Sequence, residues 1–154
     1  MLDAEQYDEA RGNFELCLRT HRQDKDARYG LALCELAAGR REAAMTELQA
    51  LVERSLTYDD YGAALRLAEA RFEAGQSEAA LELLDMVASD SYRLDHQVLL
   101  ARYQLRADRR AEAEATLDEA LATFESQPDY LRRRNGAVAT DARRLLRTLR
   151  DEPS

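Results

Sequence analysis

The chain has 154 residues, 34% of them charged, and a formal net charge of −8. Ala, Leu, Glu and Arg dominate, and there are only six Gly, two Pro and no Trp. This composition favours helices over sheets and long loops. The acidic balance disfavours nucleic acid and anionic membranes as partners, because their phosphate groups would be repelled. We therefore expect an all-α protein that does not bind nucleic acid.

The predicted helices follow from one pattern that recurs at intervals of 33 to 36 residues. Each copy has a small residue followed four, seven and eight positions later by apolar or small residues, which is one face of an α-helix. The small residues are Ala10, Ala44, Ala80 and Ala113. They predict second helices of successive pairs at residues 7–21, 41–54, 77–89 and 110–125. First helices are predicted between them, at residues 25–38, 60–74 and 95–107.

Each predicted pair is joined by a short turn that contains Gly39, Gly75 or Asp108. Glycine and aspartate tolerate the left-handed backbone that commonly ends a helix. We therefore expect positive φ angles at these three positions, and full repeats at residues 25–54, 58–89 and 93–125 of a single domain.

Both ends of the array depart from the pattern. Residues 7–22 form half a repeat, and such a start leaves an apolar flank uncovered. We therefore expect Met1 to be an internal start within a longer protein, and the flank is a candidate surface for a homodimer. At the other end, apolar residues spaced by threes and fours predict a capping helix at residues 129–150, kinked or split at Asn135-Gly136.

The tail also differs in charge. Residues 130–150 contain seven arginines and a single acid, Asp141, whereas residues 1–129 carry a net charge of −12. The arginines have three interpretations. They could lie along the acidic body as part of the cap, dock an acidic segment of a partner, or touch nucleic acid or lipid, which the acidic body disfavours.

These features together resemble the tetratricopeptide repeat, a helix pair of 34 residues. The matching residues are Leu31, Ala32, Gly39, Ala44, Leu48 and Leu51 in one repeat and Leu67, Ala68, Gly75, Ala80, Leu84 and Val87 in the next. The resemblance implies an α-α superhelix of helical hairpins. The aromatic residues usual in the first helix of the family are replaced, the later one by Glu35, Arg71 and Gln104.

A finer similarity concerns the C-terminal half. The stretches YRLDHQVLLARY, YLRRRN and ARRLLR look like the corresponding part of certain bacterial membrane-anchored tetratricopeptide proteins of unknown role. That similarity implies an N-terminal anchor in the full-length protein. The present chain contains no stretch near the about 20 apolar residues of a membrane span and no secretory signal. We expect a cytoplasmic setting without direct membrane contact.

The resemblance also implies a concave groove lined by the first helices, where a protein or peptide partner would bind. By the family's register the lining residues are Tyr29, Leu33, Leu36, Leu65, Glu69, Phe72, Glu73, Val98, Arg102, Leu105 and Arg106. The competing interpretation is that Leu36, Phe72 and Leu105 belong to the core.

The sequence shows no motif for catalysis, a cofactor or a metal. Cys17 and Cys34 are expected to be small buried residues rather than a disulfide or zinc site, and His21 and His96 to be surface residues. We therefore expect a non-catalytic protein-interaction scaffold that binds a peptide or helix. Two alternatives stay open: a self-assembly module that stacks through residues 7–21, and an accessory subunit of an enzyme complex.

Overall fold

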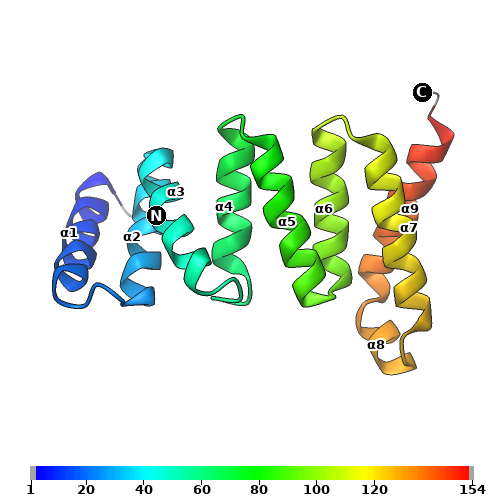
Figure 1. Ribbon diagram of the computed structural model, residues 1–154, viewed down its shortest axis with the longest axis horizontal. Coiled ribbons are helices and arrows are strands. Elements are labelled where there is room, and N and C mark those ends of the chain that lie inside the picture. Colours follow the sequence, from blue (N-terminus) through cyan, green and yellow to red (C-terminus); the bar gives the residue numbers. More distant parts are fainter. Residues whose placement is uncertain (1–2, 153–154) are drawn as a thin grey trace. The chain divides into compact units, whose positions relative to one another are not determined.

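The structure is a computed structural model that describes residues 3–152. All regular structure within these residues is α-helical (Figure 1), which confirms the expected all-α class. The helices are α1 (Ala4–Thr20), α2 (Lys25–Ala37), α3 (Arg41–Arg54), α4 (Gly62–Glu73), α5 (Ser77–Ser91), α6 (Leu94–Arg106), α7 (Arg110–Ser126), α8 (Asp129–Arg134) and α9 (Gly136–Asp151). They form two compact units, residues 1–80 and 81–154, with the boundary inside α5. Met1, which we interpreted as an internal start, lies outside the described residues.

The core of the first unit is built from the residues of the recurring pattern. Helices α2, α3 and α4 alternate in direction (Figure 1) and pack successively against one another. Ala32, Ala44 and Ala68 are fully buried, and their small side chains let the helices approach closely. Leu48 and Leu67 fill the space beside them, and each is at most 1% exposed. Burying a leucine stabilises the fold by about 1.5–3 kcal/mol.

The turns inside the helix pairs have the expected left-handed residues. The φ angles are 75° at Gly39, 82° at Gly75 and 62° at Asp108. The residue after Asp108 then donates its amide back into the helix, from Arg109 N to the Gln104 carbonyl at 2.8 Å. This bond satisfies a carbonyl that the helix end would otherwise leave unpaired.

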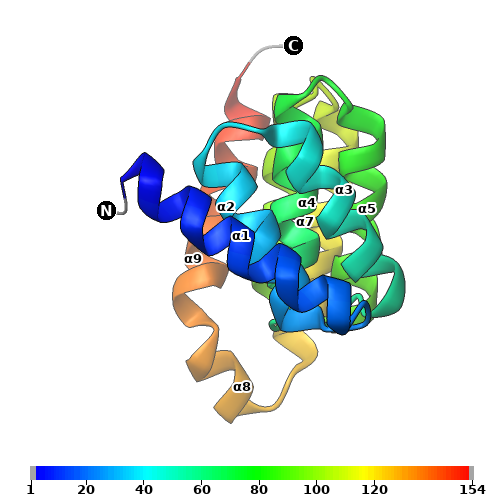
Figure 2. The same cartoon turned by 90° about the vertical axis from the view of Figure 1, so that its left-hand side faces the viewer.

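Helix α1 packs across α2 (Figure 2). The Phe14 ring lies over Gly30, where any Cβ would collide with it. Nearby, Arg11 Nε lies 2.7 Å from Oε1 of the buried Glu35. Phe14 and Arg11 therefore face α2, although no described residue of α1 is buried. On the outward side, Leu16 is the large apolar residue of α1 that is strongly exposed, at 62%.

The second unit has its own core, in which α9 seals α6 and α7. The apolar face of α9 is buried there: Ala139, Ala142, Leu146 and Leu149. The predicted tail helix is divided at Asn135, which separates α8 from α9 as the Asn-Gly pair indicated. Arg110 caps the end of α9 by donating to the Leu149 carbonyl and, at 2.7 Å, to the Glu152 carbonyl.

Candidate functional site

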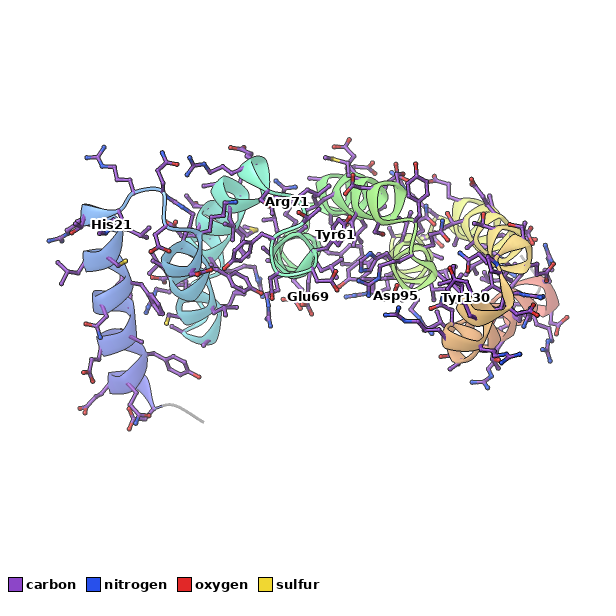
Figure 3. The ribbon with its side chains drawn as sticks, turned by 90° about the horizontal axis from the view of Figure 1, so that it is seen from below. His21, Tyr61, Glu69, Arg71, Asp95 and Tyr130 are labelled. Carbon is purple, nitrogen blue, oxygen red and sulfur yellow. The ribbon has the colours of Figure 1, made fainter. Side chains whose placement is uncertain are left out.

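In the first unit, the predicted binding residues lie on α2 and α4. Arg66 Nε on α4 donates to the Tyr29 hydroxyl on α2 at 3.1 Å, so a hydrogen bond between side chains links these two helices. Four large apolar side chains on them are only half-buried: Leu33, Leu36, Leu65 and Phe72. Glu69 is exposed, and Figure 3 shows it on the opposite side of α4 from Arg71. We call these five residues, Leu33, Leu36, Leu65, Glu69 and Phe72, the α2–α4 face.

Two other predicted residues of this unit are already engaged. The Tyr29 hydroxyl donates to Asp59 Oδ2 at 2.9 Å, and Glu73 forms an ion pair with Arg41 at 3.2 Å. Both residues therefore stabilise contacts between helices or loops of the protein itself. Leu36 and Phe72 are half-buried, so they are neither core residues nor fully exposed binding residues.

Sequence reasoning missed a polar cluster around Tyr29. The Tyr58 ring meets the Tyr29 ring edge to face, with centroids 5.3 Å apart, and the Tyr58 hydroxyl donates to Asp26. Burial and the hydrogen bond to Asp26 raise the pKa of Tyr58 to about 12. Burial and the bond to Asp59 raise the pKa of Tyr29 as well. The cluster ties α2 to the α3–α4 loop.

The α3–α4 loop is strained. Asp59, Asp60 and Tyr61 all have positive φ angles, between 52° and 69°, although such angles are uncommon for residues other than glycine. Gly62 follows, and a Cβ at that position would collide with the Asp59 carboxylate. The contacts of Tyr29 and Tyr58 therefore hold a backbone conformation that the local sequence does not favour by itself.

In the second unit, the predicted residues divide between core and surface. Val98 is 5% exposed and belongs to the core, and Leu105 packs partly buried against the same core. Arg102 is exposed. Arg106 is also exposed, and its Cζ lies 4.7 Å above the centre of the Tyr103 ring. This part of α6 therefore presents two arginines and little apolar surface.

The polar residues that stand at matched positions of the first helices are structural. Glu35, Arg71 and Gln104 are buried or half-buried, and each bonds to a neighbouring helix or to the turn before one. Their partners are Arg11 and Arg40 for Glu35, Gln49 for Arg71, and Thr116 for Gln104. These pairs take the place of aromatic packing between helices.

The tail arginines support the first of their three interpretations. Arg150 on α9 bonds to Glu114 at 2.9 Å and to Asp118 at 2.7 Å, both on α7. These two hydrogen bonds raise the pKa of the Arg150 guanidinium. Arg143 lies 3.6 Å from Glu125, also on α7. The basic cap thus lies along acidic side chains of its own unit.

The two histidines differ from each other. His21 is exposed, as expected. The expectation of a surface position is wrong for His96, which is 5% exposed and lies with Nδ1 2.8 Å from Ser91 Oγ. Ser91, five residues earlier in the chain, is the last residue of α5, so this contact joins the end of α5 to the start of α6.

The cysteines are both free thiols. Cys34 is buried, whereas Cys17 is half-buried and donates to Asp24 at 3.6 Å. Burial raises the pKa of both thiols, which disfavours the reactive thiolate. Among residues 3–152 no three His, Cys, Asp or Glu side chains gather as metal ligands. In the same part of the chain no helix has the length and apolarity to cross a bilayer.

Comparison with known proteins places this architecture. Among solved structures, the chain is similar to the Yersinia enterocolitica type III secretion translocator chaperone SycD, at 22% identity and a TM-score of 0.58, covering 81% of this chain and 82% of SycD. It is also similar to PcrH of Pseudomonas aeruginosa in complex with the chaperone binding region of PopD. The identity is 24% and the TM-score 0.58, and the match covers 80% of this chain and 89% of PcrH. The similarity to MamA has an identity of 14% and a TM-score of 0.64, and it covers 97% of this chain and 94% of MamA. No curated protein sequence matches the chain.

Two family models described as tetratricopeptide repeat match the sequence, one over residues 1–61 and the other over residues 63–91. Together they cover more than half of the chain, and the helical pairs of the structure agree with them. The fold is that of a scaffold for protein–protein interaction. The chain belongs to the tetratricopeptide-repeat family.

Proposed function

We propose that this chain is a non-catalytic scaffold whose first unit binds a peptide or an amphipathic helix of a partner protein on the α2–α4 face. The observation that carries the proposal is the set of half-buried apolar side chains beside the exposed Glu69. Such side chains gain about 25 cal/mol for each Å² of apolar surface removed from water. A few anchors of this kind provide most of the affinity of an interface.

The charge of the first unit indicates which kind of ligand would bind there. Residues 1–80 contain 16 acidic and 10 basic residues, a net charge of −6, and Glu69 has no cationic partner among the described residues. We therefore expect a ligand that carries apolar anchors flanked by basic residues, since opposite charges at the rim speed association and select the partner. The structure of PcrH with the chaperone binding region of PopD is consistent with a scaffold of this fold holding a segment of another protein.

The test is selection of peptides from a random displayed library against the intact chain. The selected peptides are then measured by calorimetry against Leu36→Ala, Phe72→Ala and the control Leu16→Ala, whose side chain is exposed on α1. We expect the two variants on the α2–α4 face to bind at least about tenfold more weakly, a loss of about 1.4 kcal/mol, and the control to bind normally. Helicity by circular dichroism verifies the fold. Equal affinity for all three variants would refute the assignment.

Self-assembly through α1 is the alternative with a specific residue behind it, the exposed Leu16. Light scattering over a range of concentrations separates the two readings. A dimer that Leu16→Glu dissociates supports assembly, and a monomer at all concentrations rejects it. Leu16 is the better site for this change than Phe14, because Phe14 packs on Gly30 inside the unit.

A further inference from the structure

A groove lies on the second unit between α5 and α7, with α6 as its floor. Its volume is about 410 Å³, and Ala88 and Leu100 contribute apolar surface to it. Leu100 and Arg102 are two residues apart on α6 and so point about 200° apart around the helix. The groove therefore opens away from the surface of α6 that bears Arg102, one of the binding residues predicted for this unit.

Two carboxylates line this groove, Asp85 on α5 and Glu119 on α7. The remaining acids of α7 are neutralised by arginines of the unit: Glu112 by Arg109, Glu114 and Asp118 by Arg150, and Glu125 by Arg143. Within residues 3–152, Glu119 and Asp85 have no such cation. The negative charge that the unit leaves uncompensated on α7 thus faces the groove.

An aromatic ring completes the lining. Tyr92 follows α5, borders the groove and is 77% exposed. Its backbone is left-handed, with φ of 53°. An exposed aromatic ring attracts a cation placed over its face. A guanidinium is planar, weakly hydrated and able to bond to carboxylates while stacking on a ring, and its alkyl stem suits an apolar floor.

We propose that this groove binds an arginine side chain of a partner protein, held between Asp85 and Glu119 and stacked on Tyr92. The site is separate from the α2–α4 face, so a partner could engage it whether or not the first unit binds a peptide. The charge requirement follows from the two carboxylates. The preference for arginine over lysine follows from the Tyr92 ring and from the position of the two carboxylates on different helices, α5 and α7.

The test uses N-acetyl-arginine amide as the probe, titrated into the intact protein at millimolar concentrations and followed by NMR. The citrulline analogue has nearly the same shape without the charge. We expect the arginine compound to shift the resonances of Ser89, Tyr92 and Thr116, which line the groove, and citrulline to leave them unchanged. Equal shifts from both compounds, or the absence of shifts at the groove, would overturn the proposal.

Variants then identify the side chains responsible. Glu119→Gln combined with Asp85→Asn is expected to weaken binding about tenfold, or 1.4 kcal/mol, whereas Glu82→Gln, an exposed acid of α5 outside the groove, leaves binding unchanged. Tyr92→Ala should weaken binding, and Tyr130→Ala, with a similarly exposed ring, should not. If the lysine amide binds as well as the arginine amide, the assignment to arginine is wrong.

Discussion

Asp108 ends α6 at the position where Gly39 and Gly75 end α2 and α4, and all three residues have left-handed backbones. The left-handed conformation is strained for residues with a Cβ, by roughly 1–2 kcal/mol, and aspartate tolerates it better than most. Asp108→Gly is therefore expected to raise the free energy of unfolding by about 0.5–1 kcal/mol. The corresponding rise in Tm, measured by thermal unfolding, is about 1–4 °C.

Gly75→Ala is the matched reverse change. Nothing lies within 4 Å of a Cβ at Gly75, so the substitution isolates the backbone effect. We expect it to lower stability by about 1 kcal/mol. A fall in Tm for Asp108→Gly would mean that the aspartate side chain contributes more than its backbone strain removes.

Tyr58 makes the stability of the first unit depend on pH in the alkaline range. Its folded pKa is about 12, whereas a tyrosine in the unfolded chain has a pKa of about 10. The folded state keeps the phenol protonated while the unfolded state loses its proton, so the contribution of Tyr58 is complete below about pH 10. It is lost as the pH rises towards 12. Denaturant unfolding should show a steeper loss of stability from pH 10 to 12 than at neutral pH.

Tyr58→Phe identifies the group responsible. The variant lacks the hydroxyl that donates to Asp26, and we expect it to lose about 1 kcal/mol at neutral pH. Its stability should then fall less between pH 10 and 12, although Tyr29, whose pKa is also raised, still titrates. Identical pH profiles for the two proteins would contradict the role given to Tyr58.

The sequence predicted the conformation of residues that act within a local pattern, but it did not predict contacts between residues far apart in the chain. Gly39, Gly75 and Asp108 act within a single turn, so their backbone conformation follows from residue type. Tyr58 bonds to Asp26 across 32 positions of sequence, and no periodicity connects them. The groove residues Asp85 and Glu119 come together only because α5 and α7 flank the same first helix.

At the scale of the element, α9 is attached to α7 by both apolar packing and charge. Arg150 bonds to Glu114 and Asp118, but its side chain is half-exposed, so the pairs are weakened by solvent. We expect Arg150→Gln to destabilise the cap slightly, as is usual for exposed ion pairs. The loss should shrink as salt is added, because ions screen exposed pairs.

The matched control is Arg144→Gln, since Arg144 is more exposed and pairs with Asp141 on its own helix. Thermal unfolding at low and high salt distinguishes the two variants. A similar, salt-independent effect in both would indicate that loss of charge in general, rather than the contact with α7, matters.

The elements themselves were largely predictable, because the buried face of each helix repeats at helical spacing. The contact between Phe14 and Gly30 could not be predicted in this way. The pattern marked Phe14 as apolar, but the small residue that receives its ring lies on another helix. The half repeat was expected to leave an apolar flank uncovered; in the structure Phe14 lies against α2, while Leu16 on the same helix stays exposed.

For the molecule as a whole, stability should be distributed unevenly, since repeat proteins are held by contacts between neighbouring elements. No described residue of α1 is buried, whereas five residues of α7 are, including the fully buried Leu117. Native-state hydrogen exchange should show α1 opening at low free energy and α7 close to the global value.

Leu117→Ala tests whether the two units unfold together. Removing this side chain leaves a cavity in the core of the second unit and should cost about 2–5 kcal/mol there. We expect protection in α6, α7 and α9 to fall by that amount, and protection in α2 and α3 to fall much less, because they share no direct packing with Leu117 in the core of residues 81–154. Leu16→Ala serves as the exposed control. An equal loss of protection at both ends of the chain would instead show that α5 couples the units into one cooperative structure, and ligand binding to the α2–α4 face would then stabilise the arginine groove as well.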